Sequence, residues 1–175
     1  FALIIFAISF AFVEAAVVFY LRTMFNYSDG YLQGSYKVLL NTGIVTFIWP
    51  DVPILNNTQI TSAEIQREVA TIIMLFAIAF LSSSKWKRRL GAFLIIFSFW
   101  DIFYYIFLKY LTGWPKSFLD IDLYFMIPVP WIGPVITPII ISAILGIVGV
   151  VLYLRKISDQ PSTLNRLNEF FKLFL

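Results

Sequence analysis

The chain has 175 residues, of which 60% are hydrophobic and 19% aromatic, and only 13% are charged. A soluble domain carries about 25% charged residues, so this composition predicts a polytopic membrane protein with room for one compact bundle. The chain contains no Cys and no His, which excludes a His- or Cys-ligated cofactor, a disulfide, and thiol or imidazole catalysis by its own residues. The net charge of +3 gives no reason to expect a nucleic-acid partner, because the basic residues flank apolar runs.

Four apolar runs predict an all-α fold. A helix rises about 1.5 Å per residue, so crossing a hydrocarbon core of about 30 Å takes roughly 20 apolar residues. We expect a four-helix transmembrane bundle over residues 1–156, with interfacial segments between its helices. The expected spans cover residues 1–21, 64–83, 90–111 and 132–154.

The first run is interrupted by Glu14 and ends at Arg22. We interpret it as a retained span, because it is too long for the apolar part of a signal peptide and no A-x-A site follows it. The connection over residues 23–61 is rich in turn-forming residues and aromatics. Within it, residues 38–49 are too short to span a bilayer and predict a helix or strand at the interface, with Trp49 at the head-group level.

The second run, over residues 64–83, begins with charged residues. Thr61 or Ser62 is the expected N-cap of this helix, and Glu64 in its first turn suits the helix dipole. Two interpretations remain open for these charges. They belong to a capped helix start among the lipid head groups, or Glu68, one turn deeper, points into the bundle.

The third run, over residues 90–111, carries a carboxylate near its middle. Polar residues recur on one face of this helix at Ser98, Asp101, Tyr104, Tyr105 and Lys109. A charged side chain at this depth costs a few kcal/mol at least, so we expect Asp101 to be protonated, hydrogen-bonded or paired with a cation. It is either a group that holds helices together or a residue of a functional site.

The segment that follows, residues 112–131, contains three prolines, which exclude a regular spanning helix. We expect a short interfacial or re-entrant element there, with Asp120 and Asp122 near the outer surface. In the fourth run, Pro138 predicts a kink. Small residues later in this run predict a face for close helix packing, made of Ser142, Gly146 and Gly149.

Basic residues predict the orientation of the chain. The turn over residues 84–89 and the pair at 155–156 are cytoplasmic by the positive-inside rule. Both termini are then cytoplasmic, both long connections lie outside, and the membrane is a prokaryotic plasma membrane. The tail over residues 157–175 predicts an amphipathic helix for the membrane surface or a partner subunit.

This orientation brings acidic residues of three spans to similar depths in the outer half of the bundle. The candidate polar site consists of Glu14, Glu68, Asp101, Tyr104 and Tyr105. The candidate mouth consists of Arg22, Glu64, Arg67, Lys109 and Asp122. The first three acids are also candidate metal ligands, because sites made of carboxylates prefer hard divalent cations such as Mg²⁺, Mn²⁺ or Ca²⁺.

Several segments together resemble a family of small prokaryotic integral membrane proteins to which no activity is assigned. They are EAAVVFYLR (14–22), EIQREVAT (64–71), FWDIFYY (99–105), GWPKS (113–117) and DLYFMIPVPWIGPVITP (122–138). The resemblance implies four spans. It implies nothing about a substrate, and no functional residue follows from it.

Three functions are compatible with these features. The first is an accessory or assembly subunit that binds other membrane subunits or a second copy of itself, which suits the small size, the aromatic faces and the absence of a catalytic motif. The second is a lipid- or metal-binding enzyme of the outer leaflet that uses its intramembrane carboxylates. A cation- or proton-coupled transporter ranks last, because four spans without an evident internal repeat suit alternating access poorly.

Overall fold

The structure, a computed structural model, describes residues 1–25, 35–55 and 57–155. The predicted tail helix over residues 157–175 lies outside this part of the chain. The described residues form four helices and four strands in the order α1, β1, β2, α2, α3, β3, β4, α4. Their bounds are α1 Ala2–Phe25, β1 Tyr36–Asn41, β2 Thr46–Pro50, α2 Thr58–Leu81, α3 Trp86–Thr112, β3 Ile121–Phe125, β4 Trp131–Pro134 and α4 Ile136–Leu154.

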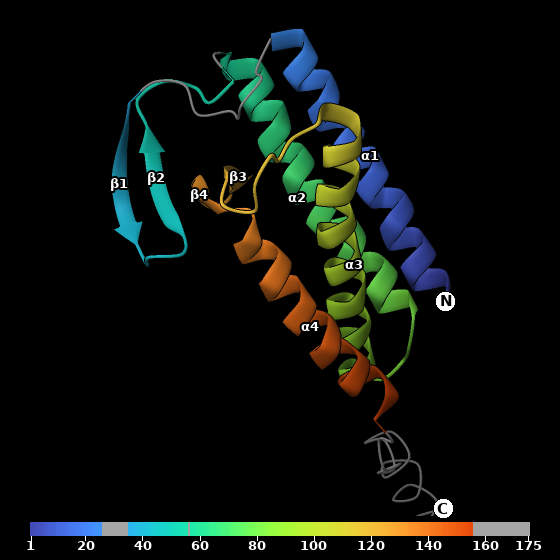
Figure 1. Cartoon of the computed structure of the whole chain (residues 1–175). Helices are drawn as coiled ribbons and strands as arrows, with labels where there is room; N and C mark the ends of the chain where they lie inside the picture. The colour runs from blue at the N-terminus through green and yellow to red at the C-terminus, as the bar shows by residue number, and fades with distance from the viewer. Residues whose placement is uncertain (26–34, 56, 156–175) are drawn as a thin grey trace, which may run out of the picture.

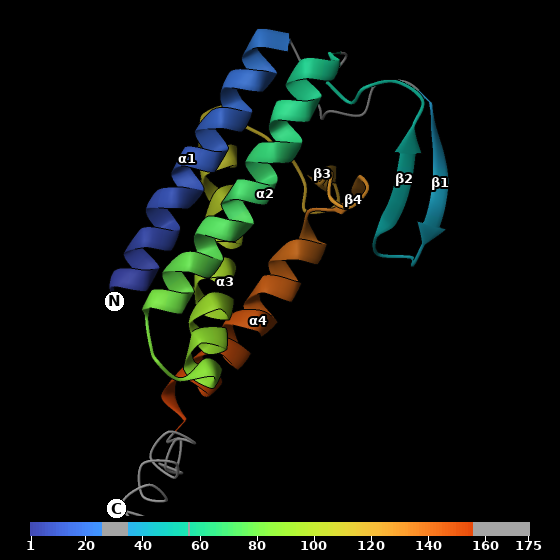
Figure 2. The same ribbon diagram turned by 180° about the vertical axis from the view of Figure 1, so that it is seen from behind.

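The four helices run in alternating directions, and α3 packs against each of the other three (Figures 1 and 2). The N-terminus, the turn between α2 and α3 and the end of α4 all lie toward the same end of the bundle. We call this end the basic end. Its described basic residues are Lys85, Lys87, Arg88, Arg89 and Arg155.

Among the described residues, three helices are long and apolar enough to cross a membrane, namely α1, α3 and α4. α2 has 24 residues, as α1 does, but carries Glu64, Arg67 and Glu68 in its first half. The helix predicted over residues 64–83 is therefore present, whereas its prediction as a fourth span is not confirmed.

The prediction of an all-α fold is confirmed only in part. The described residues are mostly helical, but the two long connections form a four-stranded antiparallel sheet of order β1-β2-β4-β3. β1 and β2 form a hairpin, and β2 pairs with β4 through Thr46 and Ile132. The sheet lies beside the half of the bundle away from the basic end (Figure 1). Strands that are far apart in the sequence pair here, and a local hydrophobic pattern carries no signal for such pairing.

Two helix starts differ from the sequence prediction. α2 is capped by Asn57, whose side-chain oxygen accepts a hydrogen bond from the Ile60 N–H at 3.0 Å, so the predicted cap at Thr61 or Ser62 is wrong. α4 begins only at Ile136. Pro138 therefore lies in the first turn, where a missing N–H interrupts no helical hydrogen bond, and the physical ground for the predicted kink is absent.

The predicted small-residue face is confirmed, and it explains how closely α3 and α4 approach. A Cβ added to Gly149 would lie 2.9 Å from the Gly91 carbonyl oxygen, and one added to Gly91 would lie 2.7 Å from the Tyr153 nitrogen. A Cβ added to Gly146 would lie 2.5 Å from the Ser98 hydroxyl oxygen. The two helix backbones are thus in direct contact, which favours association where lipid offers no hydrophobic gain.

Adding one methyl group at the closest contact tests this packing. Gly91→Ala should destabilise the protein by roughly 1–3 kcal/mol, because its Cβ meets backbone atoms that only a shift of the helices can move away. Gly146→Ala is the matched comparison and should cost less, because it meets a side chain. Thermal unfolding midpoints in detergent measure both variants, and an unchanged midpoint for Gly91→Ala would contradict the close contact.

Candidate functional site

A cavity of about 190 Å³ lies in the half of the bundle away from the basic end. All four helices and the strands β3 and β4 contribute to its wall, which is mostly apolar and aromatic. The cavity is also lined by all five residues of the candidate polar site, which are Glu14, Glu68, Asp101, Tyr104 and Tyr105. Of the candidate mouth, Glu64 and Arg67 line the cavity as well.

Arg67 of α2 joins two carboxylates of this wall. Its guanidinium forms an ion pair with Glu14 of α1 and a second one with Glu64, at 2.8 Å between Nη2 and Oε2. The other oxygen of Glu14 accepts a hydrogen bond from the Thr71 hydroxyl at 2.5 Å. Every one of these links runs between α1 and α2 or within α2, so the cluster fixes these two helices to each other.

Glu68 and Asp101 are held by different neighbours. Oε2 of Glu68 accepts a hydrogen bond from the Met126 N–H at 2.8 Å, which links α2 to the segment after β3. Oδ2 of Asp101 accepts one from the Ser142 hydroxyl at 2.7 Å, which links α3 to α4. Both carboxylates are buried, and each therefore ties a different pair of elements together at the cavity wall.

The candidate metal site is not assembled. Within the described ranges, no group of three or more His, Cys, Asp or Glu side chains is placed to hold a metal ion. Glu14 is engaged by Arg67 and Thr71, whereas Glu68 and Asp101 have their own donors. The three acids share one cavity but do not form a common ligand set.

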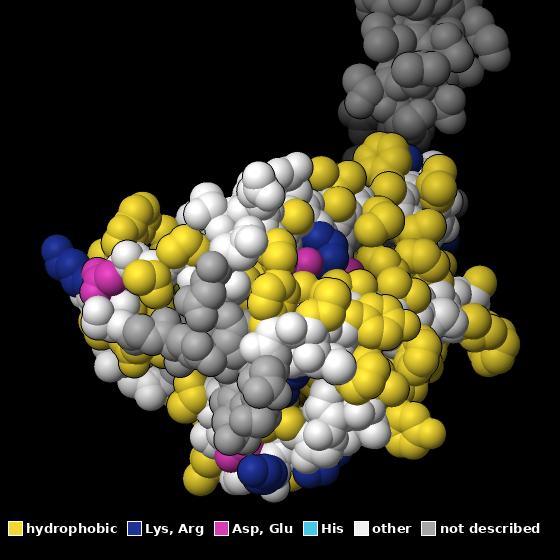
Figure 3. Space-filling model, turned by 90° about the horizontal axis from the view of Figure 1, so that it is seen from above, with side chains coloured by type: hydrophobic (Ala, Val, Ile, Leu, Met, Phe, Trp, Pro, Cys, Tyr) yellow, Lys and Arg dark blue, Asp and Glu magenta, His cyan; other side chains and the backbone are white. Residues whose placement is uncertain are grey.

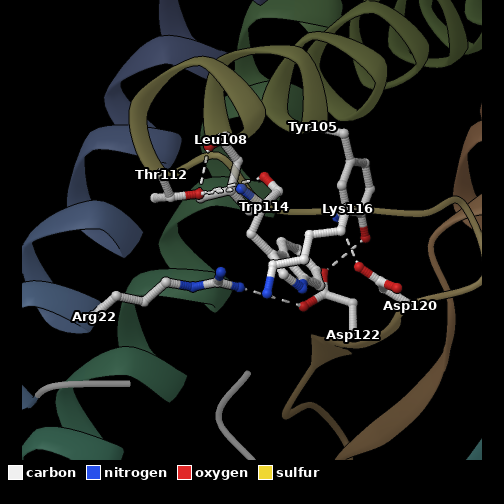
Figure 4. A network of polar contacts seen from close by, with 8 residues as sticks. All are labelled: Arg22, Tyr105, Leu108, Thr112, Trp114, Lys116, Asp120 and Asp122. Carbon is white, nitrogen blue, oxygen red and sulfur yellow. Dashed lines mark hydrogen bonds and ion pairs between the residues drawn. The ribbon is translucent and has the colours of Figure 1, made fainter. Parts of the chain in front are cut away.

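Arg22 and Asp122 form a second polar cluster, drawn in Figure 4. Arg22 Nη2 lies 4.0 Å from Asp122 Oδ1, and the Tyr105 hydroxyl donates a hydrogen bond to Asp122 Oδ2 at 2.9 Å. The Arg22 guanidinium lies over the Trp114 ring, 4.2 Å from its centre. Arg22 and Asp122 are only 5% and 3% exposed and do not line the cavity, so their place at its mouth and the outer position of Asp122 stay predictions.

Burial sets the protonation of Asp122, which lies in β3. Removal from water raises the pKa of this carboxyl to about 6, although Arg22 and the Tyr105 hydroxyl favour the ionised form and oppose the rise. For the pKa of Asp122, desolvation therefore has a larger effect than the ion pair with Arg22 at 4.0 Å. The same cause raises the pKa of Tyr124, on the same strand, to about 12.

Lys109 does not line the cavity either. It is exposed, and its ammonium group donates hydrogen bonds to the carbonyl oxygens of Gly113 and Pro115 at 2.9 and 2.5 Å. It thus satisfies carbonyl oxygens at and just after the C-terminal end of α3, where the helix dipole favours a cation. Asp120 stabilises the local turn, because its side chain accepts hydrogen bonds from the Lys116 and Ser117 N–H groups.

Several residues of the cavity wall were not predicted from the sequence. Trp100, Tyr124 and Trp131 line the cavity, and Met126 lines it beside Glu68. Trp100 directly precedes Asp101, which is the one signal that pointed to it. Its indole Nε1 is buried without a hydrogen-bond partner among the described residues.

The face of the molecule away from the basic end is shown in Figure 3. A small group of Lys or Arg and Asp or Glu side chains lies near the centre of this face, surrounded by hydrophobic side chains. Comparison of the chain with protein-family models, curated proteins and solved structures finds no match. The function must therefore be inferred from the cavity itself, and the resemblance to small prokaryotic membrane proteins stays a prediction.

The raised pKa of Asp122 predicts how stability depends on pH. The folded protein keeps this proton up to about pH 6, whereas the unfolded chain loses it near the ordinary pKa of an Asp side chain, 3.8. Between these two values the folded state binds more protons, so its stability falls as pH rises, by a few kcal/mol at most. Unfolding midpoints in detergent across this pH range measure the fall.

Asp122→Asn should flatten this part of the pH dependence, because asparagine does not titrate. Asp51→Asn is the matched control, since Asp51 is an exposed acid outside the cavity. A pH dependence that is as steep in Asp122→Asn as in the unchanged protein would assign the effect to other groups.

Proposed function

We propose that the protein resides in a prokaryotic plasma membrane and binds the head group of an amphiphilic ligand from the outer leaflet. The observation that carries this proposal is a cavity that combines ion-paired and hydrogen-bonded carboxylates with a mostly apolar, aromatic wall. Pockets for small molecules have this composition, with few polar groups that fix the orientation of a ligand.

The position of the cavity along the helices supports a ligand from the outer leaflet. With the basic end in the cytoplasm, Asp101 lies about 22 Å from the start of α3, and Glu14 about 18 Å from the start of α1, at about 1.5 Å per residue. Both values exceed half of a hydrocarbon core of about 30 Å. An amphiphile of the outer leaflet would reach this depth without leaving the bilayer.

The size of the cavity indicates which part of the ligand enters it. Pockets for drug-sized molecules have about 300–1,000 Å³, whereas this cavity has about 190 Å³. It is large enough for a head group and too small for a whole lipid. The apolar part of the ligand would then extend from the cavity toward the bilayer.

The other functions named above remain weaker proposals. An accessory subunit would use exposed apolar helix faces, and α4 exposes Ile140, Ile144 and Ile147. Lipid covers such a face equally well, so it does not favour a partner protein or a second copy of the chain over the bilayer. Neither metal binding nor coupled transport is favoured by an observation in the described residues.

Filling the cavity tests the proposed binding. Ile141 and Ile140 are neighbouring residues of α4 with exposed side chains, and only Ile141 lines the cavity. Ile141→Trp should lower the occupancy of an amphiphile that co-purifies from native membranes at least tenfold, because the larger side chain takes its place. Native mass spectrometry of the protein in a mild detergent measures the occupancy.

The matched control is Ile140→Trp, which should keep the ligand, because Ile140 does not line the cavity. Equal occupancy in both variants, or a wild-type protein that retains no amphiphile under the same conditions, would argue against this function.

The proposed orientation has its own test, made simple because the chain contains no Cys. Phe118→Cys introduces a thiol at an exposed residue between α3 and β3, and Lys87→Cys introduces one at the basic end. A membrane-impermeant maleimide should label the first in intact cells and the second only after permeabilisation. The reverse pattern would place the cavity in the inner leaflet.

A further inference from the structure

The cavity wall carries more acidic than basic groups. Of the described residues, four with carboxyl groups line it, Glu14, Glu64, Glu68 and Asp101, against one with a guanidinium, Arg67. Arg67 is already paired with Glu14 and Glu64. A phosphate or carboxylate head group would therefore find no uncompensated cation among the described residues of this wall. It would lie beside carboxyl groups, which disfavour a second anion.

Two of these carboxylates have capacity for further hydrogen bonds. Only Oε2 of Glu68 and only Oδ2 of Asp101 accept a hydrogen bond from the described residues. The two residues are 8% and 7% exposed. A buried carboxylate is stabilised by further donors, so the remaining oxygens, Oε1 and Oδ1, favour a ligand that brings N–H or O–H groups.

The same wall also contains an unused donor. Trp100 is 6% exposed and lines the cavity, and its Nε1 has no hydrogen-bond partner in the part of the chain that the structure describes. A buried donor without an acceptor destabilises the protein, and a ligand oxygen that accepts from it would relieve this cost. Aromatic rings further favour a cation over an anion in the cavity, because their faces are electronegative.

We infer that the ligand's head group is cationic and pairs an ammonium group with a neighbouring hydroxyl, as in a long-chain amino alcohol. This inference rests on the proposed function and adds the chemical class of the ligand. The ammonium group donates to the open oxygen of Glu68 or of Asp101. The hydroxyl oxygen accepts from Trp100, and the hydrocarbon chain extends into the outer leaflet.

A series of ligands with one chain and four head groups tests this chemistry. The probes are 2-amino-1-dodecanol, dodecylamine, 1-dodecanol and dodecanoate, added to the purified full chain in nanodiscs of phosphatidylcholine. Binding is measured by tryptophan fluorescence, since Trp100 and Trp131 line the cavity. Nanodiscs that contain the Ile141→Trp variant serve as the control for partition of the probes into the bilayer. Their fluorescence change, corrected for the extra tryptophan, is subtracted from that of the unchanged protein.

The amino alcohol should bind most tightly, and dodecylamine should bind at least tenfold more tightly than dodecanoate. Glu68→Gln and Asp101→Asn should each weaken the binding of dodecylamine several-fold and leave 1-dodecanol nearly unchanged, because an amide carries no charge. Asp51→Asn is the matched control and should change neither. Trp100→Phe should remove the advantage of the amino alcohol over the amine and nothing else.

The outcomes separate this inference from the proposed function. Dodecanoate or 1-dodecanol binding as tightly as dodecylamine overturns the inference and leaves an amphiphile site in place. No saturable binding of any probe, together with no co-purified amphiphile, overturns both. The ranking is measured on the unchanged protein, so it decides the question even where a variant fails to fold.

Discussion

The cost of placing charge away from water is the constraint on which this structure depends. Apolar helix faces gain little by leaving lipid for each other, so packing and polar contacts decide which helices associate. Arg67 is the clearest case, because it joins Glu14 of α1 to Glu64 of its own helix α2. The hydrogen bond between Asp101 and Ser142 does the same for α3 and α4, where contact between glycines adds close packing.

The sheet belongs to the same arrangement and is more than a connection between helices. The Met126 N–H donates to Glu68, and Asp122 of β3 lies between Arg22 of α1 and Tyr105 of α3. Each of these contacts joins the β3–β4 segment to a different helix. The segment that follows α3 thereby contributes part of the cavity wall, and buried polar groups hold it there.

The parts of this fold that depend on local sequence could be predicted. Apolar runs of sufficient length located α1, α3 and α4, and the rise per residue placed Glu14 and Asp101 at similar depths. A strand was one of the two alternatives for residues 38–49, but the sheet itself could not be predicted, because β2 and β4 pair across about half of the chain. The burial of Asp122 depends on partners from other elements, and these are invisible in a single sequence.

The polar groups of the cavity fall into two kinds, and the difference indicates their roles. Arg67 reaches both of its acidic neighbours, and both oxygens of Glu14 are engaged, so these groups are satisfied by the protein alone. Within the described part of the chain, Glu68 and Asp101 use one oxygen each, and Trp100 keeps an unused donor. A group that only holds helices together gains nothing from a donor that is buried without an acceptor, as the Trp100 Nε1 is among the described residues. Unused hydrogen-bond donors and acceptors around one cavity are therefore better explained by a ligand than by the stability of the bundle.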